Sequence, residues 1–121
     1  MKFNSTFRIL IVVLLAGVSF AWQHSRSADS PQRIEIVAKR FEFSPSEITL
    51  KKGEPVIIVL TSKDVEHGLK FTEFNQVMKA KKGESSQVEF TPDQAGTFTA
   101  QCANFCGSGH GSMKLTVHVT E

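Results

Sequence analysis

The stretch TFTAQCANFCGSGHGSMKLTVHV, residues 97–119, decides the fold prediction because it joins two strand-like segments through a glycine-rich loop. Apolar and polar residues alternate in its second half, where Leu115, Val117 and Val119 share one face of a predicted strand. The loop carries two cysteines, one histidine and one methionine, which are Cys102, Cys106, His110 and Met113. The stretch therefore predicts two consecutive β-strands with a cluster of potential ligands between them.

Short strands are also typical of the chain upstream of this stretch. Five further segments rich in β-branched residues are separated by turn residues, at 33–38, 47–50, 55–62, 68–71 and 86–90. Apolar and polar residues alternate in the segments 33–38, 86–90 and 114–119, which predicts half-buried antiparallel strands. The segment PVIIVLTS at 55–62 is apolar on both faces and predicts a central strand. The turns KKGEP, KKGES and TPDQAG lie between predicted strands. Seven short strands predict an all-β Greek-key sandwich.

The N-terminus has the character of an export signal. Lys2 and Arg8 precede an apolar run that continues in small residues, and Ser19 and Ala21 fit a small-x-small cleavage rule. The apolar core of about 14 residues would span only roughly 21 Å of a hydrocarbon layer that is ~30 Å thick. A cleaved signal at residues 1–21 is therefore expected, and an uncleaved membrane anchor is the alternative.

One small domain follows the predicted signal. Residues 22–32 are polar and predict a linker, and residues 33–121 predict the folded domain. Three of the 14 basic residues precede residue 29, so 11 basic residues accompany 12 acidic ones from there to the C-terminus. This balance leaves no basic stripe for nucleic acid. The domain is expected in the periplasm or otherwise outside the cytoplasmic membrane, anchored to its outer face only if the signal stays uncleaved.

Three explanations compete for the four side chains of the loop. Export makes a disulfide between Cys102 and Cys106 the default for a pair of cysteines. The spacing to His110 and Met113 is also that of one helical face, but alternate glycines each cost ~1 kcal/mol in a helix interior. Thiolate, imidazole and thioether are together a soft ligand set that suits copper, and methionine is a poor ligand for zinc. Only a metal site uses all four side chains.

A copper site of this kind needs a second imidazole from elsewhere in the chain. The candidate is His67 in SKDVEHGLKF, directly after the predicted central strand. His24 lies in the predicted linker and His118 lies on the polar face of the last strand, so we expect neither to be a ligand. Met78 is expected to pack in the core.

The spacing resembles that of a known family. Cys, three residues, Cys, three residues, His, two residues and Met, with glycine after the second cysteine and an upstream DVxHG, resembles the binuclear copper (CuA) domain of cytochrome c oxidase subunit II. The copper domain of nitrous oxide reductase shares the loop spacing. The resemblance covers residues 33–119 and implies a cupredoxin-like fold. A single-copper plastocyanin-like domain carries one cysteine in this loop, so the second cysteine indicates two coppers.

The resemblance implies six metal-ligating residues and no catalytic residue. Two thiolates would each bridge both coppers, one imidazole would cap each copper, and a thioether and a backbone carbonyl would be weak ligands. The bridging thiolates would be those of Cys102 and Cys106, and the capping imidazoles those of His67 and His110. The weak ligands would be the thioether of Met113 and the backbone carbonyl of Asn104. The family has a glutamate at the position of Asn104, whose side chain helps hold a magnesium ion against the catalytic subunit, and asparagine keeps only the carbonyl.

The implied function is single-electron transfer outside the membrane, with a redox donor and acceptor such as a c-type cytochrome or a terminal oxidase. The family accepts electrons through an exposed tryptophan, but this chain has no tyrosine and its one tryptophan, Trp22, lies beside the predicted cleavage site. A free-standing relative, not itself an enzyme, is therefore expected. A copper carrier or metallochaperone with the same ligands, and a disulfide-clipped binding module, remain open. Phe105 is expected to shield the copper site from water or to pack as ordinary core.

Overall fold

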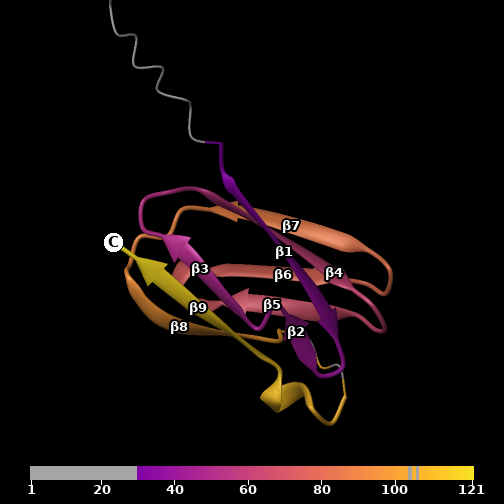
Figure 1. Ribbon diagram of the computed structural model, residues 1–121. Coiled ribbons are helices and arrows are strands. Elements are labelled where there is room, and N and C mark those ends of the chain that lie inside the picture. Colours follow the sequence, from indigo (N-terminus) through magenta and orange to yellow (C-terminus); the bar gives the residue numbers. More distant parts are fainter. Residues whose placement is uncertain (1–29, 104, 106) are drawn as a thin grey trace, which may run out of the picture.

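The computed structural model describes residues 30–103, 105 and 107–121, in which two β-sheets pack around one core. One sheet has the order β2-β1-β4-β7 and the other β3-β9-β8-β5-β6 (Figure 1). The strands are β1 (Gln32–Lys39), β2 (Glu42–Ser44), β3 (Glu47–Lys51), β4 (Val56–Ser62), β5 (His67–Phe71), β6 (Gln76–Ala80), β7 (Ser85–Phe90), β8 (Gly96–Gln101) and β9 (Lys114–Thr120). Only two 3-10 turns accompany them in the described part of the chain, η2 (Thr72–Phe74) and η3 (His110–Ser112). The predicted all-β sandwich is confirmed.

All seven predicted strands are present, and the sequence missed two more. β2 is only three residues long, and β6 contains lysine and alanine, which are poor strand formers. Antiparallel pairing with β5, from His67 opposite Ala80 to Phe71 opposite Gln76, makes β6 a strand. Met78 in β6 is buried, as expected for a packing residue. Tertiary pairing therefore overrides local preference in this segment.

The first and last strands, β1 and β9, were predicted to pair antiparallel, and this is wrong for one of the two neighbours of each strand. β1 pairs in parallel with β4, and β9 pairs in parallel with β3, whereas β1–β2, β8–β9 and β4–β7 are antiparallel. Alternation reports that one face of a strand is buried, which holds for these strands, but strand direction depends on connections outside the strand. The apolar β4 lies between β1 and β7 and is central, as predicted.

The core between the sheets determines where the strand ends lie. Ile36, Ile58 and Leu60 from one sheet and Leu69 and Leu115 from the other are completely buried. Each such side chain contributes about 1.5–3 kcal/mol relative to an exposed one. This packing holds the ends of β5, β8 and β9 in place, and these ends carry the predicted ligands.

The predicted export signal, residues 1–21, lies outside the described residues, as does most of the predicted linker. Gln32, the last residue of that linker, begins β1. No helix in the part of the chain that the structure describes is long and apolar enough to cross a membrane.

Candidate metal centre

Two connections at one end of the second sheet carry the predicted ligands. His67 is the first residue of β5, and Cys102 and Met113 are the residues next to β8 and β9 at the two ends of the β8–β9 loop. β5 and β8 run antiparallel with Lys70 opposite Gln101, so the start of β5 lies beside the end of β8. The fold therefore brings His67 and the β8–β9 loop to the same end of the sandwich.

The two ends of the β8–β9 loop are tied together and buried. The backbone N–H of Cys102 donates to the carbonyl of Met113 at 3.2 Å, and the two residues are 7% and 1% exposed. Within the loop, the N–H of Met113 donates to the carbonyl of His110 at 3.3 Å, and that of His110 donates to Gly107 at 3.1 Å. The loop contains a 3-10 turn, and its sulfur-bearing ends face the interior. Asn104 and Cys106 lie outside the described residues.

His67 is buried, and its two ring nitrogens differ in their partners among the described residues. Its Nε2 lies 2.6 Å from Oδ1 of Asp64. Its Nδ1 is buried and has no hydrogen-bond partner among the described residues. Burying a polar atom without a partner is costly. A metal-ligating histidine uses one nitrogen for the metal and the other for a carboxylate, so His67 fits a copper ligand that binds through Nδ1.

Asp64 supports His67 and was missed by the sequence reasoning. Its Oδ2 accepts the N–H of Arg40 at 2.8 Å, and its Oδ1 accepts the N–H of Val65 at 2.7 Å. Partial burial raises the pKa of Asp64, but hydrogen bonds from the Arg40 amide, the His67 ring and the Val65 amide outweigh it and lower the pKa from 3.8 to about 2. The Ser62 hydroxyl closes the same turn by donating to the Val65 carbonyl. The acidic residue three positions before His67 was the available signal.

Replacing Asp64 by Asn is expected to weaken copper binding by about 10- to 100-fold, because carboxylates that orient ligating histidines have effects of this size. Asparagine keeps the side-chain size but removes the charge that holds Nε2 as a donor. Competition titration against a copper chelator measures the affinity. Asp93→Asn, at an exposed carboxylate between β7 and β8, is the control. Equal affinities in the two variants would contradict this role for Asp64.

His110 is only half-buried, and its neighbour Phe105 projects into solvent. The centroids of the two rings lie 5.8 Å apart, and Phe105 is 77% exposed. Both expectations for Phe105, burial over the site and ordinary core packing, are therefore wrong. Of the two candidate histidines, His110 is the accessible one.

The remaining histidines and acidic residues do not enlarge the site. The side chain of His118 is 41% exposed and its Nε2 lies 3.6 Å from Oε2 of Glu47, which confirms a surface role, while His24 lies outside the described residues. In residues 30–103, 105 and 107–121, no three His, Cys, Asp or Glu side chains gather closely enough to hold a metal ion on their own. His67, Cys102 and His110, the predicted ligands of these types in the described part of the chain, are therefore not drawn together into such a group.

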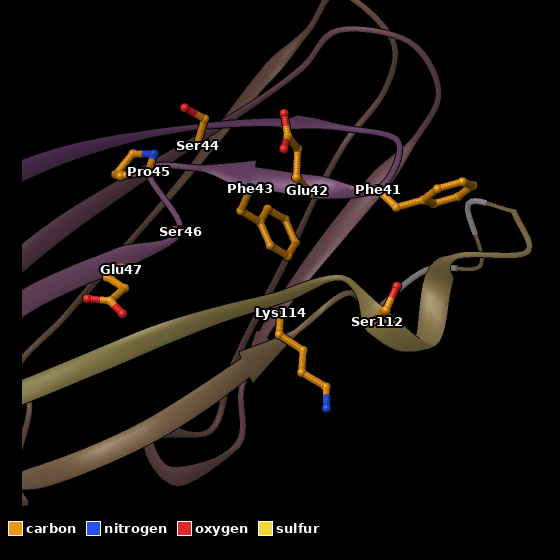
Figure 2. Close-up of a pocket in the computed structure, with 9 residues that line it drawn as sticks. All are labelled: Phe41, Glu42, Phe43, Ser44, Pro45, Ser46, Glu47, Ser112 and Lys114. Carbon is orange, nitrogen blue, oxygen red and sulfur yellow. The ribbon is translucent and has the colours of Figure 1, made fainter.

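A groove of about 610 Å³ lies next to the β8–β9 loop but is separate from these ligands. It runs along β2 and is bounded on the loop side by Ser112 and Lys114 (Figure 2). Its charged walls are mixed, with Glu42 and Glu47 opposite Lys114, and none of the predicted ligands that the structure describes lines it. The groove therefore does not serve as the metal centre.

Comparisons with known proteins show what this chain is similar to. The family model of the cupredoxin-like domain matches residues 10–117. Cytochrome c oxidase subunit 2 of Thermus thermophilus is 31% identical over 88 residues, which cover 73% of this chain and 65% of the relative. Nitrous-oxide reductase of Cupriavidus necator is 31% identical over 90 residues, covering 71% of this chain and 14% of the enzyme. The chain thus spans less than two thirds of the length of either relative.

A solved structure shows the same fold. The periplasmic domain of subunit II of the cytochrome oxidase of Bradyrhizobium japonicum matches with a TM-score of 0.68 at 18% identity, covering 74% of this chain and 84% of that domain. The family match runs from before the first strand nearly to the end of the last one. Because sequence and fold agree over most of its length, this chain belongs to the cupredoxin-like family.

Proposed function

We propose that this protein is an exported electron carrier with a binuclear, CuA-type copper centre. The observation that carries the proposal is the buried Nδ1 of His67, which lacks a hydrogen bond among the described residues while Asp64 holds Nε2. The similarity to cytochrome c oxidase subunit 2 supports copper as the metal. The proposed ligands are His67, Cys102, Asn104, Cys106, His110 and Met113.

The ligand set supports two copper ions because the loop contains two thiolates. Cys102 and Cys106 would supply two thiolates, and His67 and His110 one imidazole each, which is a soft donor set that suits copper. When bound, the copper pair supplies a site that gains and loses one electron shared between both ions. The chain's own contribution is to hold the ligands still, because buried ligands on rigid strand ends restrict movement. His67 and Met113 are packed in the interior, and half-buried His110 offers the route to the surface.

The proposed organisation and partners follow from the same ligands. Residues 1–21 would direct export, residues 22–32 would link, and residues 33–121 would form the copper domain. A carrier of this kind exchanges electrons with a redox donor and acceptor, and the names of its relatives favour a terminal oxidase or a c-type cytochrome. Both proposed coppers are fully supplied with protein ligands, so the protein would transfer electrons without itself catalysing a reaction.

Copper content and the EPR spectrum of the full chain, reduced and then loaded with copper, test the proposal. Two coppers per chain with hyperfine splitting from both nuclei would support it. A mononuclear signal would overturn it in favour of copper carriage. No copper uptake would overturn it in favour of a disulfide-clipped module. Repeated redox cycling beside a copper chelator separates the remaining roles, because an electron carrier retains its metal and a metallochaperone releases it.

A further inference from the structure

We propose that the turn formed by Arg40 and Phe41, between β1 and β2, is a clamp that positions both ligand-bearing connections, and that Phe41 is a positioning residue for His110. The clamp is a feature of the chain, and its effect on copper rests on the proposed function. Figure 1 shows β2 and the gold turn η3 at the same end of the molecule. The turn is therefore placed to contact the β8–β9 loop.

The ring of Phe41 lies directly against the backbone of the β8–β9 loop. A Cβ atom added at Gly107 would lie 2.9 and 3.0 Å from two atoms of this ring, and a Cβ atom at Gly109 would overlap the ring. Carbon atoms in good contact lie about 3.5–4.0 Å apart. Figure 2 shows the ring of Phe41 pointing away from Phe43 and toward this loop. The ring thus occupies space that any side chain at Gly109 would need.

Gly109 is required by this contact and not by its backbone conformation. Its φ of −88° and ψ of 6° lie in a region open to other residues. Gly107, with φ +136°, has a conformational reason to be glycine as well. At Gly111, apart from adjacent residues and the backbone of its own 3-10 turn, no atom of the described residues lies within 4 Å of an added Cβ. Gly109 and Gly111 flank His110, so they form a matched pair in which only Gly109 meets the ring.

The same turn also holds the connection that carries His67. The backbone N–H of Arg40 donates to Oδ2 of Asp64 at 2.8 Å, and Oδ1 of that carboxylate lies 2.6 Å from Nε2 of His67. Arg40 therefore contacts Asp64, which supports His67, and the adjacent Phe41 contacts the segment just before His110. A shift of the turn would move both histidines relative to each other.

Four variants test the clamp, namely Gly109→Ala, Gly111→Ala, Phe41→Ala and Phe41→Ala combined with Gly109→Ala. We expect Gly109→Ala to release copper to a chelator about tenfold faster than wild type, a typical size for coupling between touching residues. Its EPR hyperfine splitting and reduction potential should shift as well. Gly111→Ala should match wild type. The double variant should resemble Phe41→Ala alone, because the clash needs the ring.

A copper-free measurement keeps the clamp separate from the proposed function. The amides of Ser112 and Met113 donate to the carbonyls of Gly109 and His110 at 3.1 and 3.3 Å, so their hydrogen exchange reports the loop directly. Exchange should speed up in Gly109→Ala and Phe41→Ala and stay unchanged in Gly111→Ala. Phe41→Tyr keeps the ring and should retain wild-type exchange.

The possible outcomes are distinguishable. Wild-type protein that takes up no copper, but shows the expected exchange pattern, would refute the proposed function and leave the clamp standing. Equal behaviour of Gly109→Ala and Gly111→Ala, or strictly additive effects of Phe41→Ala and Gly109→Ala, would refute the clamp. If Gly109→Ala does not fold, unchanged loop exchange in Phe41→Ala would still overturn it.

Discussion

Cys106→Ser is expected to abolish the EPR signature of an electron shared over two coppers and to leave a single-copper site. A hydroxyl is a harder and weaker ligand for copper than a thiolate, so one of the two proposed thiolate ligands would be lost and only that of Cys102 would remain. Two histidines, one thiolate and a distant methionine are the ligand set of mononuclear blue-copper sites. This chain would retain that set, all of it within the described residues, as His67, Cys102, His110 and Met113.

Copper analysis together with EPR and optical spectra of loaded wild-type and variant protein measures this change. His118→Ala is the matched control, because this surface histidine lies far along β9 from the loop, opposite Thr97. The control should reproduce the wild-type spectra. If Cys106→Ser keeps the wild-type spectra and copper content, the binuclear assignment is wrong.

Leu60→Ala is expected to lower the free energy of unfolding of the copper-free protein by about 2–5 kcal/mol. Leu60 is completely buried in the central strand β4, so truncation removes apolar contacts and leaves a cavity between the sheets. Urea denaturation of copper-free protein is the suitable measurement, because bound metal would add stability of its own. The slope of unfolding free energy against urea should stay constant, which shows that the denatured state is unchanged.

Val77→Ala is the control for the core variant. Val77 lies in β6 and is 56% exposed, so its truncation should change the unfolding free energy by no more than about 0.5 kcal/mol. Below its unfolding transition, Leu60→Ala should load copper with the wild-type EPR spectrum, since the strand ends keep their positions. Similar stabilities of the two variants would contradict the placement of the core between the sheets.

Local signals sufficed for most strands and failed where pairing decided the outcome. Alternation in β1, β7 and β9 predicted their buried faces correctly, because a side chain's preference for water or core belongs to the residue itself. The same reasoning did not find β6, since only Val77 in it is a strong strand former and the segment pairs as a strand with β5. The parallel pairs β1–β4 and β3–β9 were likewise hidden, because alternation carries no information on direction.

The candidate site likewise has features that single residues predict and features that depend on tertiary contacts. The sequence by itself determined which donor atoms are available, because thiolate, imidazole and thioether chemistry is carried by single residues and their spacing in one loop. Tertiary structure alone decided that Asp64 holds His67, that Phe41 lies over Gly109, and that Phe105 faces solvent. Asp64 and His67 are close in sequence, but the geometry of their contact depends on the Arg40 amide from a distant turn. Contacts between segments remote in sequence arise only when the core brings strand ends together, and no local pattern encodes them.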